Sequence, residues 1–183
     1  LGLGFRFGRY VGVKMKKEAS PDYGLAQMVN YTSRMGNTAT IYGFFERPLS
    51  LGRRWETDYR LDFGCGWGTH PYNKRNNVDN ELIGSNLLFY LGAGLHATYF
   101  IQPQIGLRAG IEFAHHSNGA LNRPNKGSNL IGPMFGVVYR KVPAWNSTSA
   151  PTKQQFQKPH WYTTVAVGFG GKTLLEEWIH TQY

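Results

Sequence analysis

A histidine and a serine two positions apart, His115 and Ser117, stand where a strand-like segment gives way to a run of Asn, Gly and Pro. A serine hydroxyl becomes an effective nucleophile when a neighbouring base takes its proton, and histidine is the usual base. On one face of an extended strand the two Cα atoms lie about 6.5 to 7 Å apart, so the imidazole can reach the hydroxyl. The pair therefore suits acyl transfer without a metal or cofactor. A solvated strand end is the alternative interpretation of the same residues.

Alternation of apolar and polar residues with a period of two precedes this pair and recurs along the chain, which predicts β-strands. In residues 105–113 the apolar face carries Ile105, Leu107, Ala109, Ile111 and Phe113. The same alternation occurs at approximately 1–13, 38–48, 58–68, 86–101, 130–141 and 160–171. No apolar run reaches the roughly 18 residues of a transmembrane helix. We therefore expect an all-β protein, with about seven strands read from this chain.

The polar face of the strands indicates whether the apolar face points inward or outward. It carries many glycines together with charged residues: Arg6, Arg60, Asp62, Arg108 and Glu112. Small residues that make room for a network of charges are typical of a narrow barrel's interior, whereas a water-exposed face would carry more Lys, Ser and Glu. Strands of about ten residues also suit a tilted crossing of a bilayer. The pattern favours an antiparallel transmembrane β-barrel of the outer membrane, with at least eight strands, over a soluble barrel.

Loop lengths predict which end of the barrel is which. Long connections at approximately 15–37, 70–86 and 116–129 alternate with short ones at 49–56 and 101–104, as in barrels with long outer loops and short periplasmic turns. His115 and Ser117 then lie at the extracellular rim. The long connection after residue 141 breaks this rule. Seven is also an odd number of strands, so either the pattern leaves one strand unrecognised or the chain is part of a barrel. We treat 1–183 as a single barrel domain with a flexible linker near 143–159.

The formal net charge of +9 predicts an anionic partner, which nucleic acid, a membrane surface or a phosphorylated lipid would each satisfy. A basic protein that binds nucleic acid would gather aromatic and basic residues on one exposed face. Here the aromatic residues mostly share a face with aliphatic ones, which ranks nucleic acid last. The single cysteine, Cys65, excludes an internal disulfide and a cysteine-based metal cluster.

The period of two also divides the residues around the serine. His115 and Ser117 share the outward, lipid-facing side of their strand with Phe113, whereas His116 falls with Glu112 on the inward side. Asn129, at the start of the next strand, has the outward parity as well. We expect Asn129 to hydrogen-bond the His115 ring from that neighbouring strand.

The run His115-His116-Ser117-Asn118, followed by "RPNKGSN" at 123–129, resembles the His-x-Ser-Asn and Pro-Asn-x-Gly signatures of the PagL-type lipid A 3-O-deacylases, also known as acyloxyacyl hydrolases. The resemblance implies an outer-membrane barrel with a serine hydrolase site on its outside, level with the outer leaflet. It implies that Ser117 is the nucleophile and His115 the general base, and that Asn118 and Asn125 support the oxyanion. The expected partners are lipid A or lipopolysaccharide and the surrounding bilayer.

Asn129 departs from the family pattern, because the resemblance places the acid of a triad at this position, twelve residues after the serine. An asparagine can orient an imidazole but cannot neutralise the imidazolium that forms during attack. We expect an outer-membrane serine esterase that removes an ester-linked acyl chain from lipid A, with reduced activity or activity redirected to another ester. The alternative is a weak or inactive family barrel that serves as a structural, lipopolysaccharide-binding or assembly subunit of the outer membrane.

Four basic residues fall on the predicted outer loops: Lys74, Arg75, Arg123 and Lys126. Lysine and arginine hold phosphate groups through charge-assisted hydrogen bonds. These residues are therefore candidates for binding the phosphates of lipid A, and solvated loop charges are the alternative.

Overall fold

The computed structural model describes residues 1–10, 13–17, 29–141 and 162–172. The regular structure within these ranges is entirely β-strand: β1 (Gly2–Arg9), β2 (Val13–Lys17), β3 (Val29–Ser33), β4 (Asn37–Leu51), β5 (Trp55–Gly68), β6 (Leu87–Phe100), β7 (Ile105–Ser117), β8 (Ser128–Arg140), β9 (Tyr162–Gly168) and β10 (Gly171–Lys172). No helix in the described residues is long and apolar enough to cross a membrane. The predicted all-β class is confirmed.

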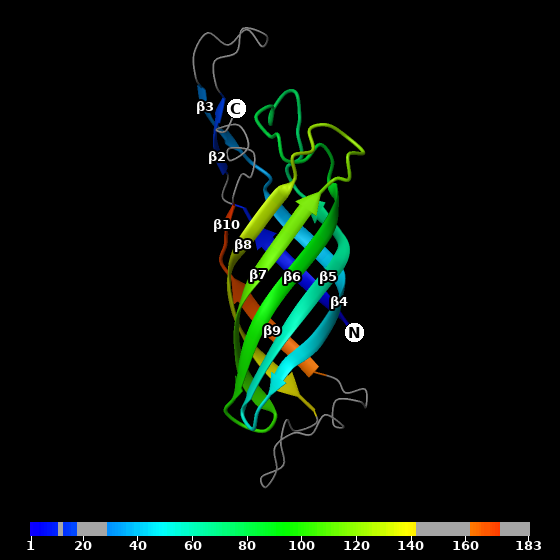
Figure 1. The fold of residues 1–183 in the computed structure, drawn as a ribbon. Helices are drawn as coiled ribbons and strands as arrows, with labels where there is room; N and C mark the ends of the chain where they lie inside the picture. Colours follow the sequence, from blue (N-terminus) through cyan, green and yellow to red (C-terminus); the bar gives the residue numbers. More distant parts are fainter. Residues whose placement is uncertain (11–12, 18–28, 142–161, 173–183) are drawn as a thin grey trace.

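One antiparallel sheet has the order β1-β4-β5-β6-β7-β8, with β9 and β10 both paired to β8, and it curls into a barrel that is open between its two edges (Figure 1). Residues 52–54 join β4 to β5 and residues 101–104 join β6 to β7, and we call the end with these connections the short-turn end. Residues 69–86 and 118–127 form loops at the opposite, long-loop end (Figure 1). The predicted alternation of long and short connections is confirmed for these four.

Some strands differ in extent from the predicted segments. β4 continues to Leu51 and β5 begins at Trp55, so the connection expected at 49–56 shrinks to a tight turn. The connection expected at 15–37 contains the hairpin β2–β3, a separate sheet beyond the long-loop end (Figure 1). Its strands are too short and too polar for the alternation to reveal them. The linker expected near 143–159 lies outside the described residues, and the single-domain assignment stays a prediction.

β1 and β9 form the two edges of the curled sheet. Each strand is antiparallel to its neighbour along the series from β1 to β9, so these two edges run in the same direction. A cavity of about 1020 Å³ lies between them, lined by both edge strands and by interior side chains that include Arg6 and Glu112. Antiparallel closure requires a further strand that runs opposite to both edges, as expected for a barrel of at least eight strands.

The exterior of the barrel is apolar. On β6, Phe89, Leu91 and Leu95 are between 43% and 60% exposed, whereas Tyr90 between them is 1% exposed. β5 and β7 alternate in the same way, with Phe63 on β5, for example, exposed. A continuous band of exposed apolar side chains around a barrel suits a lipid neighbour rather than water. The predicted outward direction of the apolar face is confirmed.

Charged side chains gather in the interior, as predicted from the polar face. Arg60 pairs with Asp62 at 2.9 Å and with Glu112 at 2.7 Å, and Glu112 also accepts a hydrogen bond from Arg6 at 3.0 Å. The Tyr90 hydroxyl donates to Asp62 at 3.1 Å. Because Arg60 and Asp62 are buried, their charges depend on these protein partners.

Further ion pairs fill the interior toward the short-turn end. Arg108 donates to Glu46 at 3.0 Å and to Asp58 at 2.7 Å. Arg140 forms a bidentate pair with Glu56, with distances of 2.8 and 2.6 Å. The geometry of such forked pairs fixes the relative positions of the strands that carry them.

We predict that Glu112→Gln lowers the free energy of unfolding by about 3 to 5 kcal/mol, because it leaves Arg6 and Arg60 without their shared carboxylate. Urea unfolding in detergent, followed by the gel mobility of the folded and unfolded forms, measures this. Asp79→Asn makes the same chemical change at an exposed loop residue and is expected to cost less than about 0.5 kcal/mol. Equal losses in the two variants would contradict the structural role of Glu112.

Candidate active site

The outer end of β7 separates the two histidines as the alternation predicts. His115 and Ser117 lie half-buried on the apolar exterior, next in line after exposed Phe113. His116 between them is completely buried in the interior. A pair of polar side chains therefore opens toward the exterior at the long-loop end of the barrel.

Asn129 contacts His115 directly. The two residues are register partners in the β7–β8 ladder, and the Nδ1 atom of His115 lies 2.6 Å from the Oδ1 atom of Asn129. An amide oxygen can only accept, so the imidazole carries its proton on Nδ1. Its Nε2 atom is then the basic nitrogen, which is the atom that a serine hydroxyl requires. The expected contact from the neighbouring strand is confirmed.

Ser117 has an apolar neighbour on one side and a glycine on the other. Phe89 on β6 is its register partner. On the β8 side stands Gly127, where an ideal Cβ atom would lie 3.1 Å from Cε1 of His115 and 3.4 Å from Cβ of Ser117. Both members of the pair therefore face the same small space, which the absent side chain of Gly127 leaves open. Gly127 also has a φ of 68°, a conformation that favours glycine.

Asn118 and Asn125, to which the family resemblance assigns support of the oxyanion, have different surroundings. The backbone N–H of Asn118 donates to Oδ1 of Asn125 at 3.0 Å, and the buried side chain of Asn118 donates to the carbonyl of Asn122 at 2.6 Å. Asn118 is thus occupied in holding the 118–122 turn. Asn125 accepts a hydrogen bond from that turn through its Oδ1 atom. Its Nδ2 group, a hydrogen-bond donor, lies on the opposite edge of the same amide.

His116 ties the inner side of the site to the barrel wall. Its Nδ1 atom lies 3.3 Å from the Tyr10 hydroxyl and its Nε2 atom 3.0 Å from Oγ1 of Thr40, so it links β7 to β4 and to the end of β1. The Tyr90 ring packs against its imidazole, with ring centroids 4.9 Å apart. The inward histidine is a structural anchor beneath the outward pair.

The two long loops pack against each other above the site. Lys126 forms an ion pair with Glu81 at 2.8 Å, and the backbone N–H groups of Lys126 and Gly127 donate to the carbonyls of Glu81 and Leu82. Leu82 is buried in a small apolar cluster with Met35, Ile83 and Leu88. The loop that carries Asn125 and Gly127 is therefore held by the preceding loop.

The four basic residues that are candidates for binding phosphate lie on two different loops. Lys74, Arg75 and Arg123 are exposed on the loops, and Lys126 is paired with Glu81. Their role in binding phosphate stays a prediction.

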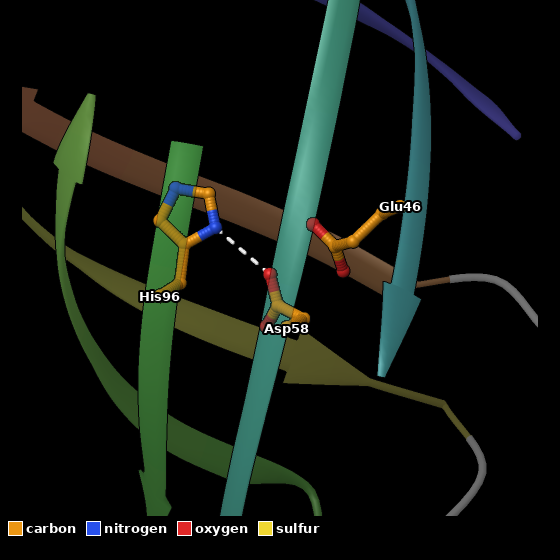
Figure 2. Close-up of side chains that lie close together, drawn as sticks. All are labelled: Glu46, Asp58 and His96. Atoms are coloured by element: carbon orange, nitrogen blue, oxygen red, sulfur yellow. Dashed lines mark hydrogen bonds and ion pairs between the residues drawn. The ribbon is translucent and has the colours of Figure 1, made fainter. Parts of the chain in front are cut away.

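A second group of chemically capable residues lies in the interior. Figure 2 shows Glu46, Asp58 and His96 pointing toward one another from β4, β5 and β6, close enough to hold a metal ion. The Arg108 guanidinium already bridges the two carboxylates, and His96 contacts Asp58 through Nδ1 at 2.8 Å. The charges of this group are thus compensated by protein cations, which makes it part of the interior ion-pair network.

Gly127 and Glu81 are parts of the site that the sequence does not reveal. Gly127 is the glycine of the Pro-Asn-x-Gly signature, but the signature assigns it no role, and only the folded structure places it beside His115. Glu81 belongs to a different loop, and only the folded structure shows its contact with Lys126.

The fold and this site define a class of protein: a β-barrel with an apolar exterior, an interior of ion pairs, and a Ser-His-Asn group on its outer wall. The family model described as lipid A 3-O-deacylase (PagL) matches residues 1–138, and the chain belongs to that family. Searches of the curated proteins and of the solved structures gave no match.

We predict that Gly127→Ala disrupts the His115–Asn129 contact, because the new methyl group would press on the imidazole and strain the backbone. Nitrogen NMR of histidine-labelled protein in detergent measures this as loss of the Nδ1-protonated tautomer of His115. Gly43→Ala is the matched control, since its nearest neighbours lie at 3.9 and 4.0 Å. An unchanged His115 signal in Gly127→Ala would show that the glycine does not position the pair.

Proposed function

We propose that the protein is an outer-membrane serine esterase that removes an ester-linked acyl chain from lipid A. The observation that carries the proposal is the 2.6 Å contact between His115 and Asn129 on the barrel exterior, beside Ser117. Membership of the lipid A 3-O-deacylase family supports the substrate class. The apolar exterior of the barrel supports the location in a membrane.

In the first half of the reaction, Nε2 of His115 takes the proton of the Ser117 hydroxyl while Oγ attacks the ester carbonyl. A tetrahedral oxyanion forms, and its collapse breaks the bond between the carbonyl carbon and the alcohol oxygen of lipid A. His115 gives its proton to that oxygen. Ser117 then carries the acyl group, and the deacylated lipid leaves.

In the second half, water replaces the alcohol. His115 takes one proton from the water, whose oxygen attacks the acyl carbonyl, and the second tetrahedral intermediate collapses to release a fatty acid. The proton returns from His115 to Oγ of Ser117. In both halves, Asn129 holds the His115 ring so that Nδ1 faces Asn129 and Nε2 is available to the reacting oxygen.

Asn125 is the better of the two proposed oxyanion donors. Its Oδ1 atom is held by the Asn118 backbone, which fixes the amide plane, and its Nδ2 group is a hydrogen-bond donor of the type that oxyanion sites use. Asn118 is engaged with Asn122 and supports the loop. The acyl chain is expected to lie along Phe89, Leu91 and Phe113, the exposed apolar residues beside the pair.

The phosphates of lipid A are assigned to the basic residues of the loops above the site. Arg123 follows the Asn118 turn directly, and Lys126 stands next to Gly127. Lys74 and Arg75 occupy the other long loop, whose base packs against the 118–127 loop. Loss of these charges would weaken substrate binding rather than the chemical step.

Asn129 also favours a second candidate function. A neutral amide leaves the imidazolium of the attack without a compensating charge, which is the defect expected of a slow or inactive enzyme. The same barrel would then bind lipopolysaccharide or form a subunit of a larger outer-membrane assembly. The two functions differ in whether a fatty acid is released.

We predict that purified protein in detergent releases 3-hydroxy fatty acid from lipid A and that Ser117→Ala abolishes the release, because no other group of the site supplies the attacking oxygen. Mass spectrometry of the free fatty acids measures both. No release by the wild type, or equal release by Ser117→Ala, would reject the esterase and leave the binding function.

We predict opposite effects of one chemical change at two asparagines. Asn129→Asp should raise kcat at least about tenfold, since a carboxylate stabilises the imidazolium that forms on His115. Asn125→Asp should lower kcat by about a hundredfold, since it keeps the acceptor for Asn118 but removes the Nδ2 donor. Initial rates of fatty acid release measure both. Losses of similar size in the two variants would indicate that each residue acts only in folding.

A further inference from the structure

Exposed basic residues lie at the short-turn end, three of them in the β4–β5 hairpin and one after β8. Arg47 lies near the end of β4, Arg53 and Arg54 lie in the turn to β5, and Lys141 directly follows β8. All four are exposed. We call these four residues the basic rim.

Aromatic side chains lie beside the basic rim. The Trp55 and Tyr99 rings pack together with centroids 4.8 Å apart, and Arg54 donates to the Tyr99 hydroxyl at 3.2 Å. The Arg47 guanidinium lies 6.0 Å from the centre of the Phe45 ring. Amphipathic aromatic side chains with neighbouring cations occur where the apolar band of a barrel meets lipid headgroups.

The acidic side chains at this end are turned away from the outer surface. Glu46, Glu56 and Asp58 point into the barrel, where Arg108 and Arg140 bind them. In the described residues, the exposed charge at the short-turn end is therefore entirely positive. The long-loop end differs, because there exposed Asp79 and half-buried Glu81 accompany the basic residues.

We propose that the basic rim binds the phosphate groups of anionic phospholipids in the leaflet opposite to lipid A. The positive charge suits a phosphate, and the adjacent aromatic and apolar side chains suit the glycerol and acyl portions of the same molecule. A free phosphate ion would use the charges alone. The inference depends on the membrane orientation in the proposed function but not on ester hydrolysis. It would therefore hold even if the protein released no fatty acid.

The test is native mass spectrometry of the whole protein in neutral detergent, titrated with phosphatidylglycerol or with phosphatidylcholine of identical acyl chains. The wild type is expected to bind phosphatidylglycerol at least about tenfold more tightly, as two or more basic residues near the headgroup should provide. The double variant R53Q/R54Q should lose most of this preference, and R53K/R54K, which keeps the charges, should retain it. Soluble glycerol 3-phosphate should not displace the lipid.

The matched control is R9Q/R34Q, which removes two exposed charges at the long-loop end. It is expected to keep the preference. Equal losses in R53Q/R54Q and R9Q/R34Q would show that net charge alone attracts the lipid and would overturn the proposal. A wild type without preference for phosphatidylglycerol, or displacement by glycerol 3-phosphate, would overturn it too.

Discussion

Charged side chains inside the barrel must find their partners among themselves, because the exterior is apolar. Arg60, Glu112 and Arg6 form one group of ion pairs, and Arg108 with Asp58 and Glu46 forms another. Removing one member of such a group leaves a buried charge uncompensated, at a cost far above that of a surface pair. The strands that carry these residues are therefore fixed in register. A shift by one residue would turn every charge toward the exterior.

The candidate active site depends on that register. His115 meets Asn129 only because β7 and β8 pair with these two residues directly opposite each other on the exterior face. Inside the barrel, buried His116 contacts Tyr10 and Thr40 and so holds the outer end of β7 against β1 and β4. The interior contacts thus help to set the distance between His115 and Asn129 on the outer surface. A rigid wall of this kind suits a site whose groups must stay within hydrogen-bonding reach.

The sequence predicted the parts of this arrangement that follow from a period of two. It predicted the seven segments, the directions of His115, His116 and Ser117, and the contact from Asn129, because strand neighbours with equal parity share a face. It did not predict the hairpin β2–β3, the support of Gly127 by Leu82 or the pairing of Lys126 with Glu81. Those features arise from short polar strands and from contacts between loops, for which no periodicity exists.

The barrel dimensions connect the two ends of the molecule. Leu107 on β7 is the register partner of Tyr99 in the aromatic group beside the basic rim, and Ser117 lies ten residues farther along the strand. At about 3.3 Å per residue this is roughly 33 Å of strand, and a tilt of about 35 to 45° reduces it to a height of about 23 to 27 Å. The apolar band of such barrels is about 25 Å tall. With the basic rim at the phosphates of one leaflet, as we propose, this height would set Ser117 near the headgroup boundary of the other leaflet, the depth at which ester bonds of a membrane lipid lie.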